Sequence, residues 1–229
     1  MAPDLRIVGE DVLFAHWPVD VTALEAIVPD GLSVDTYDGS GWVSALAHEV
    51  TAAGVDSLPL SPLPTFGEVE FRTYVTHDGN PGVHFFSCDT GQEPTSTLSN
   101  QLFSLPYYPA SIEVRRHDGQ ITVRSRRKTE SNARFDVQYR PTGDNAEAEA
   151  GSLAEFLVER HTYYAGADSD TLVVGTVERD PWQLTEVDAT IRTNTLFESI
   201  GLDTPASAPT FHYSPGFESH LVGRERRPR

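Results

Sequence analysis

The chain has 229 residues, a single cysteine and a formal net charge of −17, from 34 acidic and 17 basic residues. A chain of this length can bury a sizeable core without a metal or a disulfide, and the lone Cys88 excludes an internal disulfide. Because of the negative charge, we expect it to bind neither nucleic acids nor anionic membranes.

The only lysine is Lys128, and all other basic residues in the count are arginines. An acidic surface repels itself at low ionic strength, whereas molar salt shortens the Debye length to about 3 Å and screens the repulsion. The composition predicts a halophilic protein, with an acidic protein of an ordinary cytoplasm as the alternative. The first residues lack the basic and apolar parts of a signal peptide, and no apolar run reaches about 18 residues. We therefore expect a soluble, cytoplasmic protein.

Short runs of β-branched and aromatic residues predict strands along most of the chain. Three Asp-Gly pairs between such runs predict hairpins, because a type I′ turn needs positive φ at both central positions. These pairs are Asp38-Gly39, Asp78-Gly79 and Asp118-Gly119. The expected strands cover residues 12–17, 32–37, 42–50, 68–76, 83–88, 111–116, 120–127, 135–139, 171–178, 186–192 and 217–222.

Helices are few. Asp20 is a suitable N-cap for a helix over residues 21–28, and the capping box from Ser152 to Glu155 opens another that runs to about His161. Two shorter helices are expected around residues 97–103 and 195–200. We expect an α+β, mainly β fold, with a closed or nearly closed barrel and helices outside it. One domain would cover residues 1–223, and residues 224–229 would form a disordered polar tail.

The charged strand over residues 66–75 is the first candidate site. Glu68, Glu70, Arg72 and Tyr74 share one face of a strand, since side chains alternate with a period of two. If this face lines the interior of the barrel, it forms a polar patch suited to a carboxylate or carbonyl ligand. If it faces outward, it is an ordinary solvated strand face.

Two aromatic segments are further candidates. Tyr107 and Tyr108 lie between prolines, in a rigid corner that suits either a ligand site or core packing. His212 and Tyr213 precede the last strand, where they offer a titratable ring and a hydroxyl, or else pack in a tight turn. The sequence has no P-loop, no G-x-G-x-x-G, no G-x-S-x-G and no HExxH pattern, so we expect neither a cofactor nor a metal.

Several segments together resemble domain-of-unknown-function family 2071, the YqjF-like proteins. They are residues 42–44 (WVS), 69–75 (VEFRTYV), 81–87 (PGVHFFS), 105–110 (LPYYPA), 151–160, 181–182 (PW) and 212–216 (HYSPG). The resemblance implies the acetoacetate-decarboxylase-like fold, a β-barrel or curved antiparallel sheet with a few peripheral helices.

The decarboxylase itself is a more distant comparison. Its aromatic-x-Glu-Val strand start looks like residues 66–69 here, which keep Glu68. Its two adjacent lysines, one of which forms the Schiff base, correspond to Tyr107 and Tyr108. Tyrosine cannot form an imine with a keto acid, and Lys128 lies too far along the chain to replace the lysine. We therefore do not expect acetoacetate decarboxylase activity.

Two hypotheses follow for the function. In the first, a pocket binds a small carboxylate or carbonyl compound: Arg72 anchors it, Glu68 acts as the catalytic acid or base, and Tyr107, Tyr108, His212 and Tyr213 complete the site. In the second, the domain is a non-catalytic ligand sensor or a structural dimer module, and hence a homo-oligomer. The pocket hypothesis predicts Glu68 and Arg72 inside a cavity. The structural version of the second predicts them at solvent or at a subunit interface.

Overall fold

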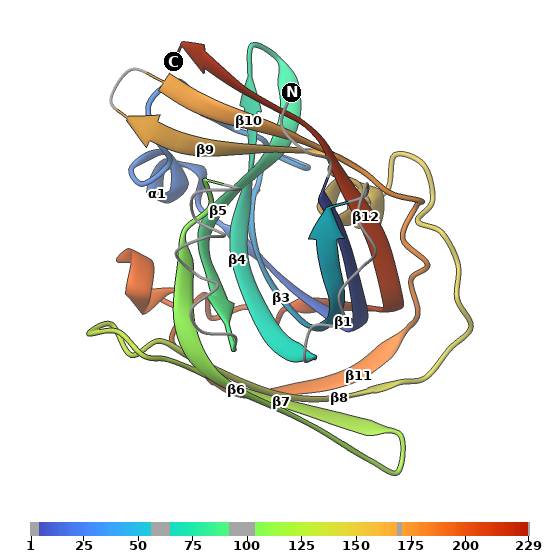
Figure 1. Cartoon of the computed structure of the whole chain (residues 1–229). Helices are drawn as coiled ribbons and strands as arrows, with labels where there is room; N and C mark the ends of the chain where they lie inside the picture. Colours follow the sequence, from blue (N-terminus) through green and yellow to red (C-terminus); the bar gives the residue numbers. More distant parts are fainter. Residues whose placement is uncertain (1–4, 56–64, 92–103, 169–170, 229) are drawn as a thin grey trace.

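The computed structural model describes residues 5–55, 65–91, 104–168 and 171–228. Most of them lie in one curved sheet of 12 strands, so the fold is mainly β, as expected (Figure 1). The strands are β1 (Leu5–Val19), β2 (Ser33–Val34), β3 (Gly41–Val55), β4 (Phe66–His77), β5 (Asn80–Thr90), β6 (Tyr107–His117), β7 (Gln120–Arg127), β8 (Arg134–Pro141), β9 (Thr162–Asp168), β10 (Thr171–Glu178), β11 (Val187–Asn194) and β12 (Thr210–Pro228). The helical segments are α1 (Val21–Glu25), α3 (Leu153–Val158) and a 3-10 turn at Glu198–Ile200.

Seven strands close into a ring in the order β5-β9-β10-β12-β1-β3-β4, because β5 pairs with β9 as well as with β4. The end of β5 also pairs with β6, and the sheet continues from there through β7 and β8 to β11 (Figure 1). β5 runs parallel to β9 and to β6, whereas the remaining pairings between these strands are antiparallel. We call the seven strands the ring, and β6, β7, β8 and β11 the outer sheet.

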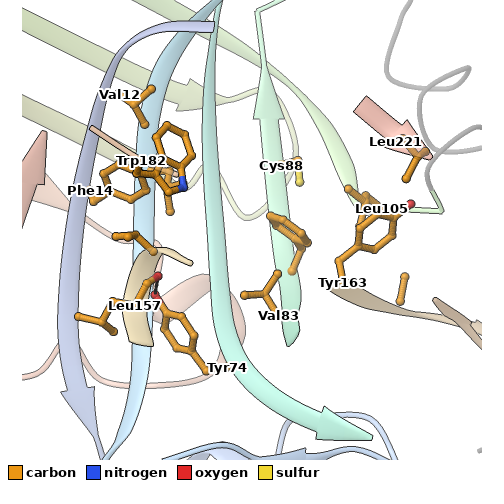
Figure 2. Packing of buried hydrophobic residues seen from close by; sticks show 14 of the residues in the cluster. Val12, Phe14, Tyr74, Val83, Cys88, Leu105, Leu157, Tyr163, Trp182 and Leu221 are labelled. Carbon is orange, nitrogen blue, oxygen red and sulfur yellow. Dashed lines mark hydrogen bonds between the residues drawn. The ribbon is translucent and has the colours of Figure 1, made fainter. Parts of the chain in front are cut away.

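Side-chain alternation along the ring strands divides most of the apolar residues between two cores, beside a small third cluster of Val75, Tyr164 and Val174. On β1, Phe14 belongs to a cluster with residues of all seven ring strands, which lies inside the ring and borders its cavity. Its neighbours Leu13 and Ala15 belong to a second cluster, which joins β1, β3 and β4 to β7 and β8 of the outer sheet. Figure 2 shows part of the inner cluster, including Tyr74 and Trp182. The inner face of the ring therefore surrounds the space in which the site lies.

Turn and cap chemistry explains much of the local structure. Both residues of each Asp-Gly pair have positive φ: Asp38 (50°), Gly39 (75°), Asp78 (49°), Gly79 (76°), Asp118 (48°) and Gly119 (73°). The last two pairs connect β4 to β5 and β6 to β7, as predicted. The first pair also forms a tight turn, but β2 pairs with β4 and not with β3, so no hairpin forms there.

Both predicted helix starts are confirmed. Asp20 accepts a hydrogen bond from the backbone N–H of Ala23 at 3.1 Å, and Ser152 accepts one from the N–H of Glu155 at 3.2 Å. Each helix is shorter than expected. α3 ends at Val158 because the next residue has ψ of 76°, outside the helical range.

Other segments differ from expectation. The expected helix over residues 97–103 lies outside the described residues, and the one over residues 195–200 is reduced to the 3-10 turn. β9 was not expected. Residues 224–228 were expected to form a disordered tail, but they belong to β12 and pair with residues 171–175 of β10. Their charged side chains are exposed, so the pairing rests on backbone hydrogen bonds that hydrophobic patterning does not reveal. In the described part of the chain, no helix is long and apolar enough to cross a membrane.

Candidate functional site

A cavity of about 140 Å³ lies inside the ring. Its polar wall comes from β3, β4 and β6, with His48, Glu68, Glu70, Arg72 and Tyr107. Much of the rest is apolar and aromatic. It includes the aromatic residues Phe85, Tyr163, Trp182 and Phe217, and two further arginines, Arg160 and Arg179, also border the cavity.

The period of β4 explains why the charged residues share this wall. Glu68, Glu70 and Arg72 point into the ring, while Val69 and Phe71 point into the outer cluster. Both Glu68 and Arg72 are buried, with 6% and 7% of their surface exposed. The face expected from the sequence is therefore an interior face and not a solvated one.

His48 and the two carboxyl groups form a compact cluster. His48 lies opposite Glu68 in the β3–β4 register, and one ligand atom each of His48, Glu68 and Glu70 lies within 4.8 Å of the others. Burial raises the pKa of Glu68 well above its ordinary value, and Glu70 and then Asp89 raise it further. Burial also raises the pKa of Glu70, although Arg72 opposes this.

The pKa of His48 moves in the opposite direction. Burial and then the charge of Arg72 lower it to about 4, so this imidazole is neutral at pH 7. Its ring packs edge-on against the ring of Phe217, with 5.4 Å between centroids. The cavity wall thus presents a fixed neutral imidazole beside two carboxyl groups.

Arg72 is incompletely satisfied. Its Nη1 lies 3.9 Å from Oε2 of Glu70, and its guanidinium carbon lies 6.0 Å from the centroid of the Phe85 ring. Its Nε and Nη2 are buried and have no hydrogen-bond partner among the described residues. Leaving such donors unpaired in the interior is costly, so Arg72 keeps hydrogen-bonding capacity that its neighbours do not use.

Tyr107 and Tyr108 point to opposite faces of β6. Tyr107 lines the cavity, where burial and then Glu68 raise the pKa of its phenol well above the ordinary value. Tyr108 does not line it; the guanidinium carbon of Arg127 lies 4.3 Å from the centroid of its ring. Only one of the two positions that correspond to the lysine pair therefore faces the cavity.

His212 and Tyr213 do not line the cavity. The ring of His212 lies 5.3 Å from that of His16, and burial lowers its pKa. The hydroxyl of Tyr213 donates to Oδ1 of Asp11 at 2.6 Å, and its ring packs 6.0 Å from that of Tyr139. The structure places both residues inside β12 and not before the last strand, and there they pack against β1 and β8 without lining the cavity.

Two arginines of the cavity wall were not predicted from the sequence. Arg160 donates to Asp35 at 2.8 Å and stacks on Phe156, with 4.3 Å from its guanidinium carbon to the ring centroid. Arg179 pairs with Glu159 at 2.9 Å and lies over the ring of Trp182. His48 was also missed, because only the register of β3 against β4 brings it to Glu68. Glu70 was recognisable from the alternation but was not given a role.

The chain matches, over residues 9–218, the sequence profile of family DUF2071, described as "Uncharacterized conserved protein". It is 37% identical over 211 residues to "Uncharacterized protein YqjF" of Bacillus subtilis (strain 168), an alignment that covers 92% of this chain and 87% of the relative. Both matches extend over the β4 wall and the β6 corner that form the site.

Solved structures show the same fold. The enduracididine biosynthesis enzyme MppR complexed with pyruvate superposes with a TM-score of 0.68 at 15% identity, covering 99% of this chain and 91% of that one. An acetoacetate decarboxylase-like enzyme from Sphingomonas wittichii RW1 gives 0.64 at 15% identity, with 98% and 93% covered. Acetoacetate decarboxylase from Legionella pneumophila gives 0.66 at 10% identity, with 98% and 87% covered. The chain belongs to the DUF2071 family and has the acetoacetate-decarboxylase-like fold.

Proposed function

We propose that the cavity binds a small carboxylate or carbonyl compound, held by Arg72. The observation that carries this proposal is the pair of buried nitrogens of Arg72, Nε and Nη2, that lack a hydrogen-bond partner among the described residues. A carboxylate satisfies two parallel N–H donors at once, and such charge-assisted pairs are the stronger hydrogen bonds in proteins. The oxygen atoms of the ligand would therefore lie at the edge of the guanidinium that is formed by Nε and Nη2.

The electrostatics of the cavity support an anionic ligand despite the net charge of −17. Arg72, Arg160 and Arg179 all line the cavity, and each is fixed by an ion pair or a ring contact. A pocket with a few placed polar groups on an apolar lining is typical of small-molecule sites. Since the cavity is only about 140 Å³, the ligand is a small acid and not a large cofactor.

For chemistry on the bound compound, we assign proton transfer to Glu68. It lies on the same face of β4 as Arg72, four positions away, and lines the same cavity. No lysine lies on the described cavity wall, and the residue that β6 contributes to it is Tyr107, one of the two positions that correspond to the decarboxylase's lysine pair. The proposed chemistry is therefore non-covalent acid–base catalysis.

One alternative is a ligand sensor that does not turn its ligand over. Such a sensor would use the same pocket and would differ from an enzyme only because no product forms. The purely structural module predicted Glu68 and Arg72 at solvent or at a subunit interface. Both side chains are buried along the cavity, which favours the pocket. Tyr107 in place of a lysine is the one observation that favours a sensor over an enzyme.

The test is a calorimetric titration with small acids in molar KCl, beginning with pyruvate and acetoacetate because of the fold relatives named above. We expect at least one to bind the wild type, and Arg72→Met to abolish binding, since methionine keeps much of the volume and removes the donors. Arg115→Met, at an exposed ion pair on β6, is the matched control and should bind normally.

A thermal-shift series provides an independent readout. A ligand at 100 times its dissociation constant adds about 2.7 kcal/mol to the stability of the native state. The proposal is wrong if Arg72→Met binds the same acid as tightly as the wild type does. It is also wrong if none of the acids binds the wild type. Product formation by a bound acid, measured by chromatography, separates an enzyme from a sensor.

A further inference from the structure

We infer that His48, Glu68 and Glu70 form a binding site for one divalent transition-metal ion, and that Zn²⁺ fits their donor set best. This inference goes beyond the proposed carboxylate site and stands without it. It rests on the cluster geometry, on an unsatisfied ring nitrogen and on the charge of the cavity wall.

The geometry is that of three converging donors. One ring nitrogen of His48 and one carboxylate oxygen each of Glu68 and Glu70 lie within 4.8 Å of one another, a spacing that small side-chain rotations can close around a single ion. His48 and Glu68 are register partners on β3 and β4, and Glu70 follows on the same face. All three belong to the hydrogen-bonded ring, and sites on regular strands hold their ligands more accurately than sites on loops.

The donor types select the ion. One imidazole and two carboxylates suit Zn²⁺ and its first-row neighbours, whereas Ca²⁺ and Mg²⁺ prefer all-oxygen sites. Three protein ligands that border a cavity leave a further coordination position for water or a ligand, as in catalytic zinc sites. Because this cluster borders the cavity, the open coordination position faces the cavity, where an exchangeable ligand has room.

His48 supplies the second observation. Its side chain is almost fully buried, with 3% of the residue exposed, and its Nδ1 has no hydrogen-bond partner among the described residues. The ring packs edge-on against that of Phe217, which covers one side of it. This Nδ1 nitrogen is therefore free to act as a metal ligand beside the two carboxyl groups.

The charge of the wall agrees with a bound cation. The two carboxyl groups cannot both ionise in one small cavity without repelling each other, and Arg72 approaches only as far as 3.9 Å from Glu70. A divalent ion would neutralise the pair and leave Arg72 as the net positive group of the wall, which suits an anionic ligand. In the metal-bound form Glu68 would have lost its proton and would act as a ligand, so that the ion takes over the polarisation of a bound carbonyl.

The experiment uses the full chain without a histidine tag, stripped with a chelator and titrated with Zn²⁺ in molar KCl by calorimetry. We expect one ion per chain. His48→Gln and Glu68→Gln should each weaken binding by more than about 100-fold, since even the outer partners of metal ligands contribute 10–100-fold. The matched controls are His117→Gln and Glu113→Gln on exposed positions of β6, which should bind as the wild type does.

Two further measurements keep the outcome clear. Co²⁺ in place of Zn²⁺ should give visible absorption bands in the wild type and the controls but not in His48→Gln. Circular dichroism and thermal unfolding check that each variant is folded. If His48→Gln or Glu68→Gln does not fold, Glu70→Gln replaces it as the ligand variant. The inference is overturned if Zn²⁺ binds His48→Gln and the wild type equally, or if no stoichiometric binding occurs.

The same samples separate this inference from the proposed function. Pyruvate titrations with and without Zn²⁺ report on Arg72 directly. Carboxylate binding to the metal-stripped protein, without any Zn²⁺ site, would overturn only the metal inference. A Zn²⁺ site without carboxylate binding would overturn only the proposed function.

Discussion

Asp89 and Arg127 form a buried ion pair that joins β5 of the ring to β7 of the outer sheet. Nε of Arg127 donates to Oδ1 of Asp89 at 2.7 Å, and the two side chains are 4% and 1% exposed. Burial raises the pKa of Asp89 to about 6 although Arg127 opposes this. Desolvation therefore outweighs the attraction between the two charges, and the pair is expected to be sensitive to loss of either partner.

We predict that Asp89→Leu destabilises the protein by about 3–5 kcal/mol, because it leaves a buried guanidinium without a countercharge. The double variant Asp89→Leu, Arg127→Met should lose less stability than either single variant loses, since apolar groups then replace both charges. Urea unfolding in molar KCl measures all three. Glu113→Gln, which removes one partner of an exposed pair, should change stability by less than about 1 kcal/mol. Additive effects of the two single substitutions would contradict the prediction.

A second prediction concerns acid stability and begins with the tautomer of His16. The hydroxyl of Tyr74 donates to the carbonyl of Leu157 at 2.7 Å, so its oxygen accepts from Ser44 at 2.6 Å. The oxygen of Ser44 therefore accepts from Nδ1 of His16, also at 2.6 Å. His16 thus carries a proton on Nδ1, and its buried Nε2 has no partner among the described residues.

Protonation of Nε2 would place a charge on a fully buried ring. Burial, followed by the charges of His212 and Arg72, lowers its pKa well below the ordinary value of 6.5. The unfolded chain then binds a proton that the folded chain does not. The contribution of His16 to the free energy of unfolding is therefore fully present above about pH 6.5. It is lost as the pH falls from 6.5 toward the folded-state pKa, and the free energy of unfolding then falls by up to about 1.4 kcal/mol per pH unit.

We predict that His16→Gln, whose amide can still donate to Ser44, shows a smaller loss of stability between pH 7 and pH 5. Urea unfolding at a series of pH values measures the slope. His117→Gln removes an exposed histidine of the β6–β7 hairpin and should leave the slope unchanged. An equal slope in His16→Gln and the wild type would show that His16 is not among the groups responsible.

Salt dependence provides a third prediction, which also tests the proposal that the protein is salt-adapted. With a net charge of −17, raising KCl from 0.1 M to 1 M should raise the unfolding temperature, since the Debye length falls from about 10 Å to about 3 Å. A variant with four exposed carboxylates made neutral, Glu25→Gln, Asp118→Asn, Glu130→Gln and Asp144→Asn, should gain less from the same salt. Equal gains in the two proteins would assign the effect to the salt itself and not to screened repulsion.

The sequence predicted the parts of this site that depend on local rules. Alternation along β4 placed Glu68 and Arg72 on one face, and the face proved to line the cavity. The Asp-Gly pairs predicted two hairpins because their turn geometry is a local property. Tyr107 was assigned to the site through the family resemblance, and the structure places it on the cavity wall.

The sequence did not reveal how strands that are far apart along the chain pair with one another. His48 reaches the cluster only through the register of β3 on β4, and register is fixed by the whole sheet. Tyr108, His212 and Tyr213 were assigned to the site from composition and resemblance, but their strand positions direct them elsewhere. β9 was missed because Thr162–Asp168 has no clear alternation, although it closes the ring against β5 and β10.

The last prediction follows from the opposite directions of Tyr107 and Tyr108. Only Tyr107 faces the cavity, so a lysine introduced there would lie beside Glu68 in a desolvated wall, where burial lowers the pKa of an amine and activates it as a nucleophile. We expect Tyr107→Lys to form an imine with pyruvate, which borohydride reduces to a stable adduct detectable by mass spectrometry of the intact chain.

Tyr108→Lys is the matched control, since it adds the same amine one residue away on the opposite face of β6, beside Arg127. It should give no more adduct than the wild type, whose Lys128 reports the background. Adding Arg72→Met to Tyr107→Lys should reduce the adduct, because the carboxylate anchor that holds pyruvate in the cavity is then absent. Equal labelling of the two single variants would mean that the cavity neither concentrates the keto acid nor activates the amine, and it would weaken the assignment of Arg72 as the anchor.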